Sequence, residues 1–187
     1  MKQLITIDQY LFKIINYGWS NPFFDFLMPW LRNPNTWLPL YLFLILLVLF
    51  NYRKTGFWWF FLAVGCVIIS DFITGSILKN NVIRLRPCNN PEIISWVHVL
   101  VGKRPITSSF ASSHASVSFG IATFFYQTLK ESFNNWPFLF FFWAFSISFA
   151  QVYVGVHYPL DIICGGLIGI LIGYLSGKSF NKNYGLV

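Results

Sequence analysis

Charged residues are scarce in this sequence. Asp, Glu, Lys and Arg together make up 10% of its 187 residues, whereas a soluble domain carries about 25%. So little charge excludes a water-soluble globule, and the high hydrophobic content excludes a disordered chain. The three cysteines are odd in number and widely spaced, which excludes a disulfide-stabilised scaffold.

Apolar residues take the place of the missing charges: 56% of the chain is hydrophobic and 21% is aromatic. They form five runs close to the length of about 20 residues with which a helix crosses the hydrocarbon core of a bilayer. The runs are residues 36–52, 57–79, 113–129, 136–154 and 158–177. Trp and Tyr stand at several ends of these runs, as is typical of the bilayer interface. The sequence therefore predicts an all-α integral membrane protein with about five transmembrane helices.

Residues 1–32 follow a different pattern. Apolar side chains recur there every three to four residues, with Asp8 and Lys13 off this stripe, as in an amphipathic helix that lies at a membrane interface. The stripe consists of Leu4, Ile7, Tyr10, Leu11, Ile14 and Ile15. The next apolar segment, residues 21–31, is short and contains two prolines, so we expect a broken helix that does not cross alone.

Five crossings put the N-terminus and the 80–112 loop on one face of the membrane. The turns at 53–56 and 130–135 and the C-terminal tail share the other face, and their Lys and Arg residues mark it as cytoplasmic. The 80–112 loop is equally basic, but a loop that holds an anion has its own reason to be so. We expect one membrane domain over 1–187, with a helical bundle over 36–177, a substrate loop at 80–112 and an active site at the outer face.

The net charge of +7 is compatible with nucleic acid, anionic lipid headgroups or a phosphorylated substrate. Position along the chain separates these partners. Cations concentrate between the second and third runs, at Lys79, Arg84, Arg86, Lys103 and Arg104. No basic tail or RNA-binding motif accompanies them, so the sequence predicts no nucleic-acid partner.

Three polar stretches stand at the ends of the runs on the expected outer face: residues 79–87, 110–114 and 151–161. The first begins with Lys79 and ends with an Arg-Pro pair. The second is rich in serine and leads into the third run. The third bridges the fourth and fifth runs. Because all three meet the same face of the bundle, we expect them to assemble one site.

The first two stretches predict a phosphate cradle. Lys79 and Arg86 supply two positive charges. The free N–H groups of Ser113 and His114 stand at a helix N-terminus, where the helix dipole also favours an anion.

The histidines supply the chemistry. His157 precedes Asp161 by four residues, which brings the two side chains to one helical face, so the carboxylate can hold one ring nitrogen while the other attacks phosphorus. His114 is placed to protonate the departing oxygen. The remaining histidine, His98, has no carboxylate cluster or paired cysteines beside it. We therefore expect neither a metal ion nor any other cofactor.

Together the stretches resemble the motifs of the type 2 phosphatidic acid phosphatases, lipid phosphate phosphatases that share a site plan with vanadium haloperoxidases. The family pattern is Lys, six residues, Arg-Pro; then Pro-Ser-Gly-His; then Ser-Arg, five residues, His, three residues, Asp. Residues 79–87 match the first motif completely, and residues 111–114 keep the Ser and His of the second. The third motif keeps its His and Asp but has Ala150-Gln151 in place of Ser-Arg.

The resemblance implies a membrane phosphatase in which His157 attacks a lipid phosphate and forms a phosphohistidine that water then hydrolyses, with His114 as acid and then as base. It implies that phosphate oxygens bind to Lys79, Arg86, Ser112 and the position of Gln151. Candidate substrates are undecaprenyl pyrophosphate, phosphatidylglycerol phosphate and the phosphate groups of lipid A. The expected location is the inner membrane of a bacterium, with the site facing the periplasm.

Gln151 leaves an alternative open. Glutamine offers neutral donors where arginine offers a full charge, and the loss of one such donor costs about a hundred- to a thousandfold in rate. Either Arg84, Lys103 or Arg104 replaces the missing cation, or the protein is a weakened or inactive family member that binds or moves phospholipid. A channel or carrier is disfavoured because polar side chains are rare inside the runs, Asp71 being one exception.

Overall fold

The computed structural model describes residues 2–186, and every regular element in that range is helical. The α-helices are α1 (Lys2–Lys13), α2 (Pro22–Leu31), α3 (Leu38–Asp71), α4 (Lys79–Asn81), α5 (Ser113–Phe133), α6 (Leu139–Tyr153) and α7 (Pro159–Asn183). One π-helical turn, Ile14–Gly18, continues α1, and another, Phe72–Leu78, joins α3 to α4. The predicted all-α class is confirmed.

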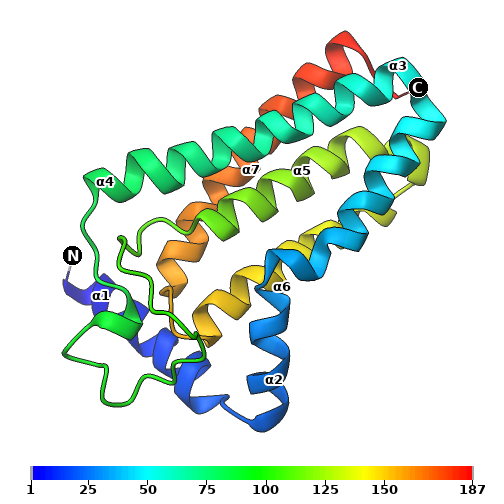
Figure 1. Ribbon diagram of the computed structural model, residues 1–187. Coiled ribbons are helices and arrows are strands. Elements are labelled where there is room, and N and C mark those ends of the chain that lie inside the picture. Colours follow the sequence, from blue (N-terminus) through cyan, green and yellow to red (C-terminus); the bar gives the residue numbers. More distant parts are fainter. Residues whose placement is uncertain (1, 187) are drawn as a thin grey trace.

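α3 is a helical hairpin. Its backbone leaves the helical region at Arg53, with φ 42° and ψ −110°, and the chain reverses there into two arms (Figure 1). Gly56 lies against the Val48 carbonyl, where a Cβ atom would stand 2.7 Å from the oxygen, so the close approach at the turn requires glycine. The first arm corresponds to the predicted run 36–52. The second arm, together with the π-helical turn Phe72–Leu78 that follows it, corresponds to the run 57–79.

Three helical segments of the described chain are long and apolar enough to cross a membrane: Pro34–Asn81, Trp136–Tyr153 and Pro159–Asn183. The first of them contains the Arg53 turn. The predicted run 113–129 forms α5, which is not among the three. Because α5 is largely covered by other helices, it can carry serine and threonine that a lipid-facing helix avoids. The figure of five crossings remains a prediction.

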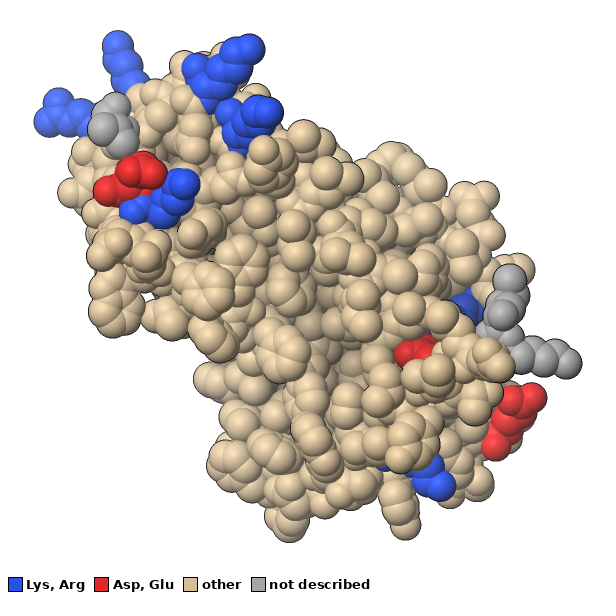
Figure 2. All heavy atoms as spheres, turned by 180° about the vertical axis from the view of Figure 1, so that it is seen from behind, with Lys and Arg blue, Asp and Glu red and all other residues tan. Residues whose placement is uncertain are grey.

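The surface has the character expected of a membrane protein. Figure 2 shows lysine and arginine side chains gathered at the two ends of the elongated molecule, with a belt of other residues between them. Large apolar side chains such as Phe43, Phe50 and Phe142 are exposed. Water solvates such a surface poorly and lipid tails solvate it well, so the belt is suited to the bilayer core.

Within α1 the predicted apolar stripe faces outward: Leu4, Ile7 and Tyr10 are each more than half exposed. Ile15, the last residue of the stripe, lies in the π-helical turn that follows and packs against the core. The opposite side of the helix packs against the rest of the protein. Asp8, which the pattern places off the stripe, is 4% exposed, and its Oδ1 accepts a hydrogen bond of 2.8 Å from the Leu160 N–H at the start of α7. α1 therefore presents apolar side chains to the surroundings and a carboxylate to the protein.

α5 is the central helix and contacts α3, α6 and α7. It approaches α7 closely because glycines recur on α7 at Gly165, Gly169 and Gly173. A Cβ atom at Gly169 would lie 2.1 Å from the carbonyl oxygen of Ser116. One at Gly165 would lie 2.4 Å from the carbonyl oxygen of Ser112, at the start of α5. These small residues set the position of the α5 N-terminus relative to α7.

We predict that Gly169→Ala lowers the thermal unfolding midpoint of the detergent-solubilised protein. The added methyl group meets backbone atoms that cannot rotate away, and such overpacking costs about 1–3 kcal/mol. Gly65→Ala is the matched control, because a Cβ there meets nothing within 4 Å, and alanine is the better helix former by about 1 kcal/mol. Equal midpoints for the two variants would contradict the tight α5–α7 seam.

Candidate active site

The predicted site residues meet at a cavity of about 390 Å³. Its lining residues come from the end of the bundle where α1, α2 and the loop that follows α4 gather (Figure 1). Six of the eight predicted residues line it: Lys79, Arg86, Ser113, His114, Gln151 and His157. Both histidines therefore line the same cavity as the lysine and arginine of the first motif.

The other two predicted residues, Ser112 and Asp161, are fully buried behind the lining. The Ser112 hydroxyl is the N-cap of α5 and accepts a hydrogen bond of 3.4 Å from the Ala115 N–H. The Ser112 N–H donates to the carbonyl oxygen of Asp161 at 3.1 Å. In the structure Ser112 therefore caps α5 and ties that helix to α7. That it also binds a phosphate oxygen stays a prediction.

His157 is held as a neutral ring. Nη1 of Arg86 lies 3.1 Å from Nε2 of His157, and because a guanidinium only donates, this nitrogen must be the unprotonated one. The ring proton is then on Nδ1, which faces Oδ2 of Asp161 at 3.5 Å. That distance is longer than a hydrogen bond but close enough for the carboxylate to orient the ring.

Burial lowers the pKa of His157 to about 4. The Arg86 cation lowers this pKa further, whereas the Asp161 carboxylate favours the protonated ring and so opposes the shift. The side chain is 2% exposed. At neutral pH the ring therefore keeps the lone pair on Nε2, the form in which imidazole is a nucleophile.

Asp161 is the centre of a buried network. Its Oδ1 accepts from Nη1 of Arg84 at 2.5 Å, and its Oδ2 accepts from the Ser109 hydroxyl and, at 2.9 Å, from the Tyr158 N–H. Arg84 also binds Asp8 of α1 and lies 4.2 Å from the centre of the Tyr158 ring. Arg84 therefore connects α1 to the carboxylate that orients His157.

The two predicted cations are positioned by neutral partners. Lys79 Nζ donates to the Ser113 hydroxyl at 3.1 Å. Nε and Nη2 of Arg86 donate to the carbonyl and hydroxyl oxygens of Thr107 at 2.9 and 3.1 Å. Among residues 2–186, no ion pair includes Lys79 or Arg86, so both can attract an anion in the cavity.

None of the cations expected to replace the family arginine lines the cavity. Arg84 is bound to carboxylates, and Lys103 and Arg104 are exposed on the loop. A residue that the sequence analysis missed, Arg32 at the end of α2, lines the cavity instead, and its Nε donates to Oε1 of Gln151 at 3.3 Å. No local pattern marks Arg32, since only the docking of α2 on α6 brings it there.

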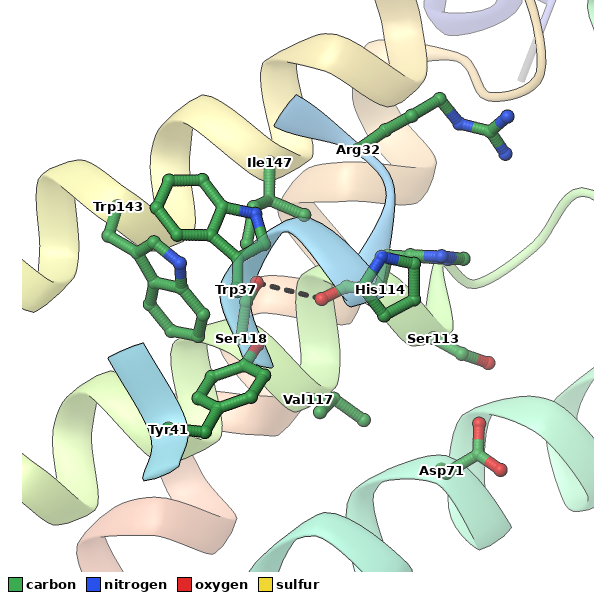
Figure 3. A pocket seen from close by; sticks show the side chains of 11 residues that line it. Arg32, Trp37, Tyr41, Asp71, Ser113, His114, Val117, Ser118, Trp143 and Ile147 are labelled. Carbon is green, nitrogen blue, oxygen red and sulfur yellow. Dashed lines mark hydrogen bonds between the residues drawn. The ribbon is translucent and has the colours of Figure 1, made fainter. Parts of the chain in front are cut away.

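A second hollow of about 210 Å³ adjoins the cavity and shares Arg32, Asp71, Ser113 and His114 with it. Its other side is aromatic. Figure 3 shows Trp37, Tyr41 and Trp143 gathered on one side and the shared polar residues on the other. The site is thus a basic compartment that continues into an apolar one, which suits a ligand with a phosphate head and an apolar body.

The donor set also bears on metals. Within residues 2–186, no three His, Cys, Asp or Glu side chains form a group that could hold a metal ion. The cavity instead combines the neutral His157 ring, the His114 ring, three cations and one carboxylate, that of Asp71. This arrangement can bind a phosphate group and attack it.

The sequence profile of the PAP2 superfamily matches residues 59–184. The chain belongs to the PAP2 superfamily. The predicted relationship to the type 2 phosphatidic acid phosphatases is confirmed. As a member of this family, the PAP2 protein is a membrane phosphatase. It is 33% identical to a lipid A 4'-phosphatase of Bacteroides thetaiotaomicron, over 92% of this chain and 76% of the relative. It is also 33% identical to an undecaprenyl-diphosphatase of Sulfolobus acidocaldarius, over 94% of this chain and 79% of the relative.

Solved structures show the same fold. The crystal structure of LpxE from Aquifex aeolicus superimposes with a TM-score of 0.69 at 26% identity, covering 92% of this chain and 95% of that one. A transmembrane PAP2 type phosphatidylglycerolphosphate phosphatase from Bacillus subtilis has a TM-score of 0.68 at 21% identity, covering 97% of this chain and 88% of that one. The helical architecture of this PAP2 protein is therefore that of solved PAP2 enzymes.

We predict that Arg84→Gln destabilises the PAP2 protein. The change leaves Asp8 and Asp161 buried without their cation, and removal of one member of a buried ion pair costs about 3–5 kcal/mol. The measurement is the thermal midpoint in detergent. Arg104→Gln, on the exposed part of the same loop, is the control. A midpoint for Arg84→Gln equal to that of the control would refute the network.

We predict further that His157 stays neutral down to about pH 4 and carries its proton on Nδ1. Imidazole nitrogen shifts in long-range NMR spectra of the ¹⁵N-labelled protein report both properties. The His157 signals are assigned by their absence from His157→Asn. A midpoint near the ordinary histidine value of about 6.5, or a proton on Nε2, would contradict the burial and the Arg86 contact.

Proposed function

We propose that this protein removes a phosphate group from a membrane lipid phosphate or pyrophosphate, with all of residues 1–187 acting as one membrane-embedded phosphatase domain. The observation that carries the proposal is the neutral His157 ring, with its unprotonated Nε2 beside Arg86 in a cavity that Lys79 also lines. The aromatic hollow next to this cavity supports a lipid as the substrate.

In the proposed first step, the Nε2 lone pair of His157 forms a bond to phosphorus while the bond from phosphorus to the lipid oxygen breaks. The negative charge of the bound phosphate favours the protonated form of His114, and this protonated ring gives its proton to the departing oxygen. Lys79 and Arg86 hold the phosphate oxygens and stabilise the charge that develops on them. Asp161 stabilises the positive charge on the His157 ring in the phosphohistidine.

In the proposed second step, water attacks the phosphorus of the phosphohistidine. His114, now unprotonated, takes a proton from this water, the nitrogen–phosphorus bond breaks, and inorganic phosphate leaves. The lone pair returns to Nε2 of His157, which restores the starting state. Every step uses side chains of the chain and water, so the proposal includes no metal ion or other cofactor.

Among the three candidate substrate classes, we put a lipid A type phosphate first. The support is the name of the Bacteroides thetaiotaomicron relative, a lipid A 4'-phosphatase, which aligns with 92% of this chain. Undecaprenyl pyrophosphate and phosphatidylglycerol phosphate are the alternatives. We also propose a bacterial inner membrane, five crossings, a periplasmic site and an interfacial α1. The outward apolar side of α1 and the charged ends of the molecule support this placement.

A second candidate function is a non-catalytic protein that binds or moves phospholipid. The observation that favours it is Gln151, a neutral side chain where the family pattern has arginine. This candidate shares the cavity and the lipid with the first, and differs in predicting no turnover.

We predict that the wild-type protein in detergent releases inorganic phosphate from a panel of the three lipids, and that His157→Asn reduces release to background. Asparagine cannot form the phosphohistidine. His98→Asn, which changes a histidine outside the cavity, serves as the control and keeps most of the activity. EDTA leaves the wild-type rate unchanged.

Two outcomes contradict the proposal. Release equal in the wild type and His157→Asn, with both proteins folded, supports the binding protein instead. Release that EDTA abolishes refutes the metal-free mechanism.

A further inference from the structure

Arg32 is a cation at the cavity. It caps the C-terminal end of α2 and lines both the main cavity and the aromatic hollow. Among residues 2–186, none of the ion pairs includes it. Its Nε donates to Oε1 of Gln151, which leaves the two terminal nitrogens of the fork for another acceptor. A half-buried guanidinium in this state is suited to an anion that is not part of the protein.

Gln151 provides a second, independent observation. Its side chain is fully buried and lines the same cavity. In the described part of the chain, Nε2 of Gln151 has no hydrogen-bond partner. A buried donor without an acceptor is costly, and native structures seldom leave one unused. The amide oxygen is therefore bound to Arg32, and the amide nitrogen, in a residue that lines the cavity, has no partner among residues 2–186.

Burial also weakens the hold of water on Arg32, and it lowers the pKa of the guanidinium from its ordinary value. The group stays charged at neutral pH, because arginine does not lose its proton in proteins. A cation that has already lost part of its hydration gains more from an incoming phosphate than a solvated one does.

We propose, on the basis of the phosphatase function above, that Arg32 and Gln151 together bind the transferring phosphate in place of the single arginine of the family motif. Gln151 accepts from Nε of Arg32 and so aims the guanidinium, while its own Nε2 donates to a phosphate oxygen. The positive charge that the family motif places on α6 comes from the end of α2 in this protein, and it binds the same phosphate group. α2 is then part of the active site.

The test is a charge-relocation experiment on the full-length protein in detergent. Arg32→Met removes the charge and keeps an unbranched apolar stem for packing. The double variant Arg32→Met/Gln151→Arg returns the charge at the family position. The matched control is Lys103→Met, which removes an exposed cation from the loop beside the site. Thermal unfolding verifies that each protein is folded.

The first readout is kcat/KM for phosphate release from the best lipid of the panel. We expect Arg32→Met to lose about a hundred- to a thousandfold, as for the removal of one donor to a developing oxyanion. We expect the double variant to regain at least about tenfold, and Lys103→Met to stay near wild type. A folded Arg32→Met that loses less than about tenfold, or a folded double variant that does not recover, overturns the proposal.

The second readout does not depend on turnover. Inorganic phosphate, compared with potassium chloride of equal ionic strength, raises the thermal midpoint of a protein that binds it. We expect this rise in the wild type, its loss in Arg32→Met and its return in the double variant. An undiminished rise in Arg32→Met overturns the assignment of Arg32. If the wild type shows this rise but releases no phosphate, the phosphatase function is refuted. The binding measurements on the variants then test the role of Arg32 on their own.

Discussion

One buried carboxylate, that of Asp161, organises the active site. A lone carboxylate in the protein interior is costly, and here the cost is offset by Arg84 and Ser109 from the loop. The backbone carbonyl of the same residue binds the N–H of Ser112 at the start of α5. These contacts form only when the loop, α5 and α7 are docked together. The orientation of His157 therefore depends on the whole end of the bundle.

The packing of the bundle positions the helices that form the site. The glycines of α7 let α5 approach until backbone meets backbone, and this seam runs from Gly173 to Gly165, beside the N-cap of α5. At the other side of the network, Arg84 binds Asp8 and so brings α1 into the same assembly. The first helix thus contributes a buried carboxylate to the catalytic end, while its apolar side chains face away from the protein.

The division of the hollow into a basic and an aromatic compartment follows from where it lies. Helix ends and the loop provide polar groups at one end of the molecule. The bundle below them is apolar and is therefore suited to lipid. Asp71 and His114 stand where the two compartments join. A phosphorylated lipid matches both environments at once. Arg32 adds a third cation to the basic compartment beside Lys79 and Arg86. It supplies there the positive charge that glutamine at position 151 lacks.

The membrane class, the helical runs and most of the cavity lining can be predicted from the amino-acid sequence, because the length of an apolar run and the spacing of a motif are local properties. The runs 36–52 and 57–79 lie in α3 and the π-helical turn that follows it, and the three motif stretches lie at one end of the bundle. No local pattern predicts that Ser112 caps a helix, that Asp8 faces inward or that Arg32 reaches Gln151. Each of these depends on how one helix docks on another, and such contacts join residues too far apart in the chain for any local pattern to record.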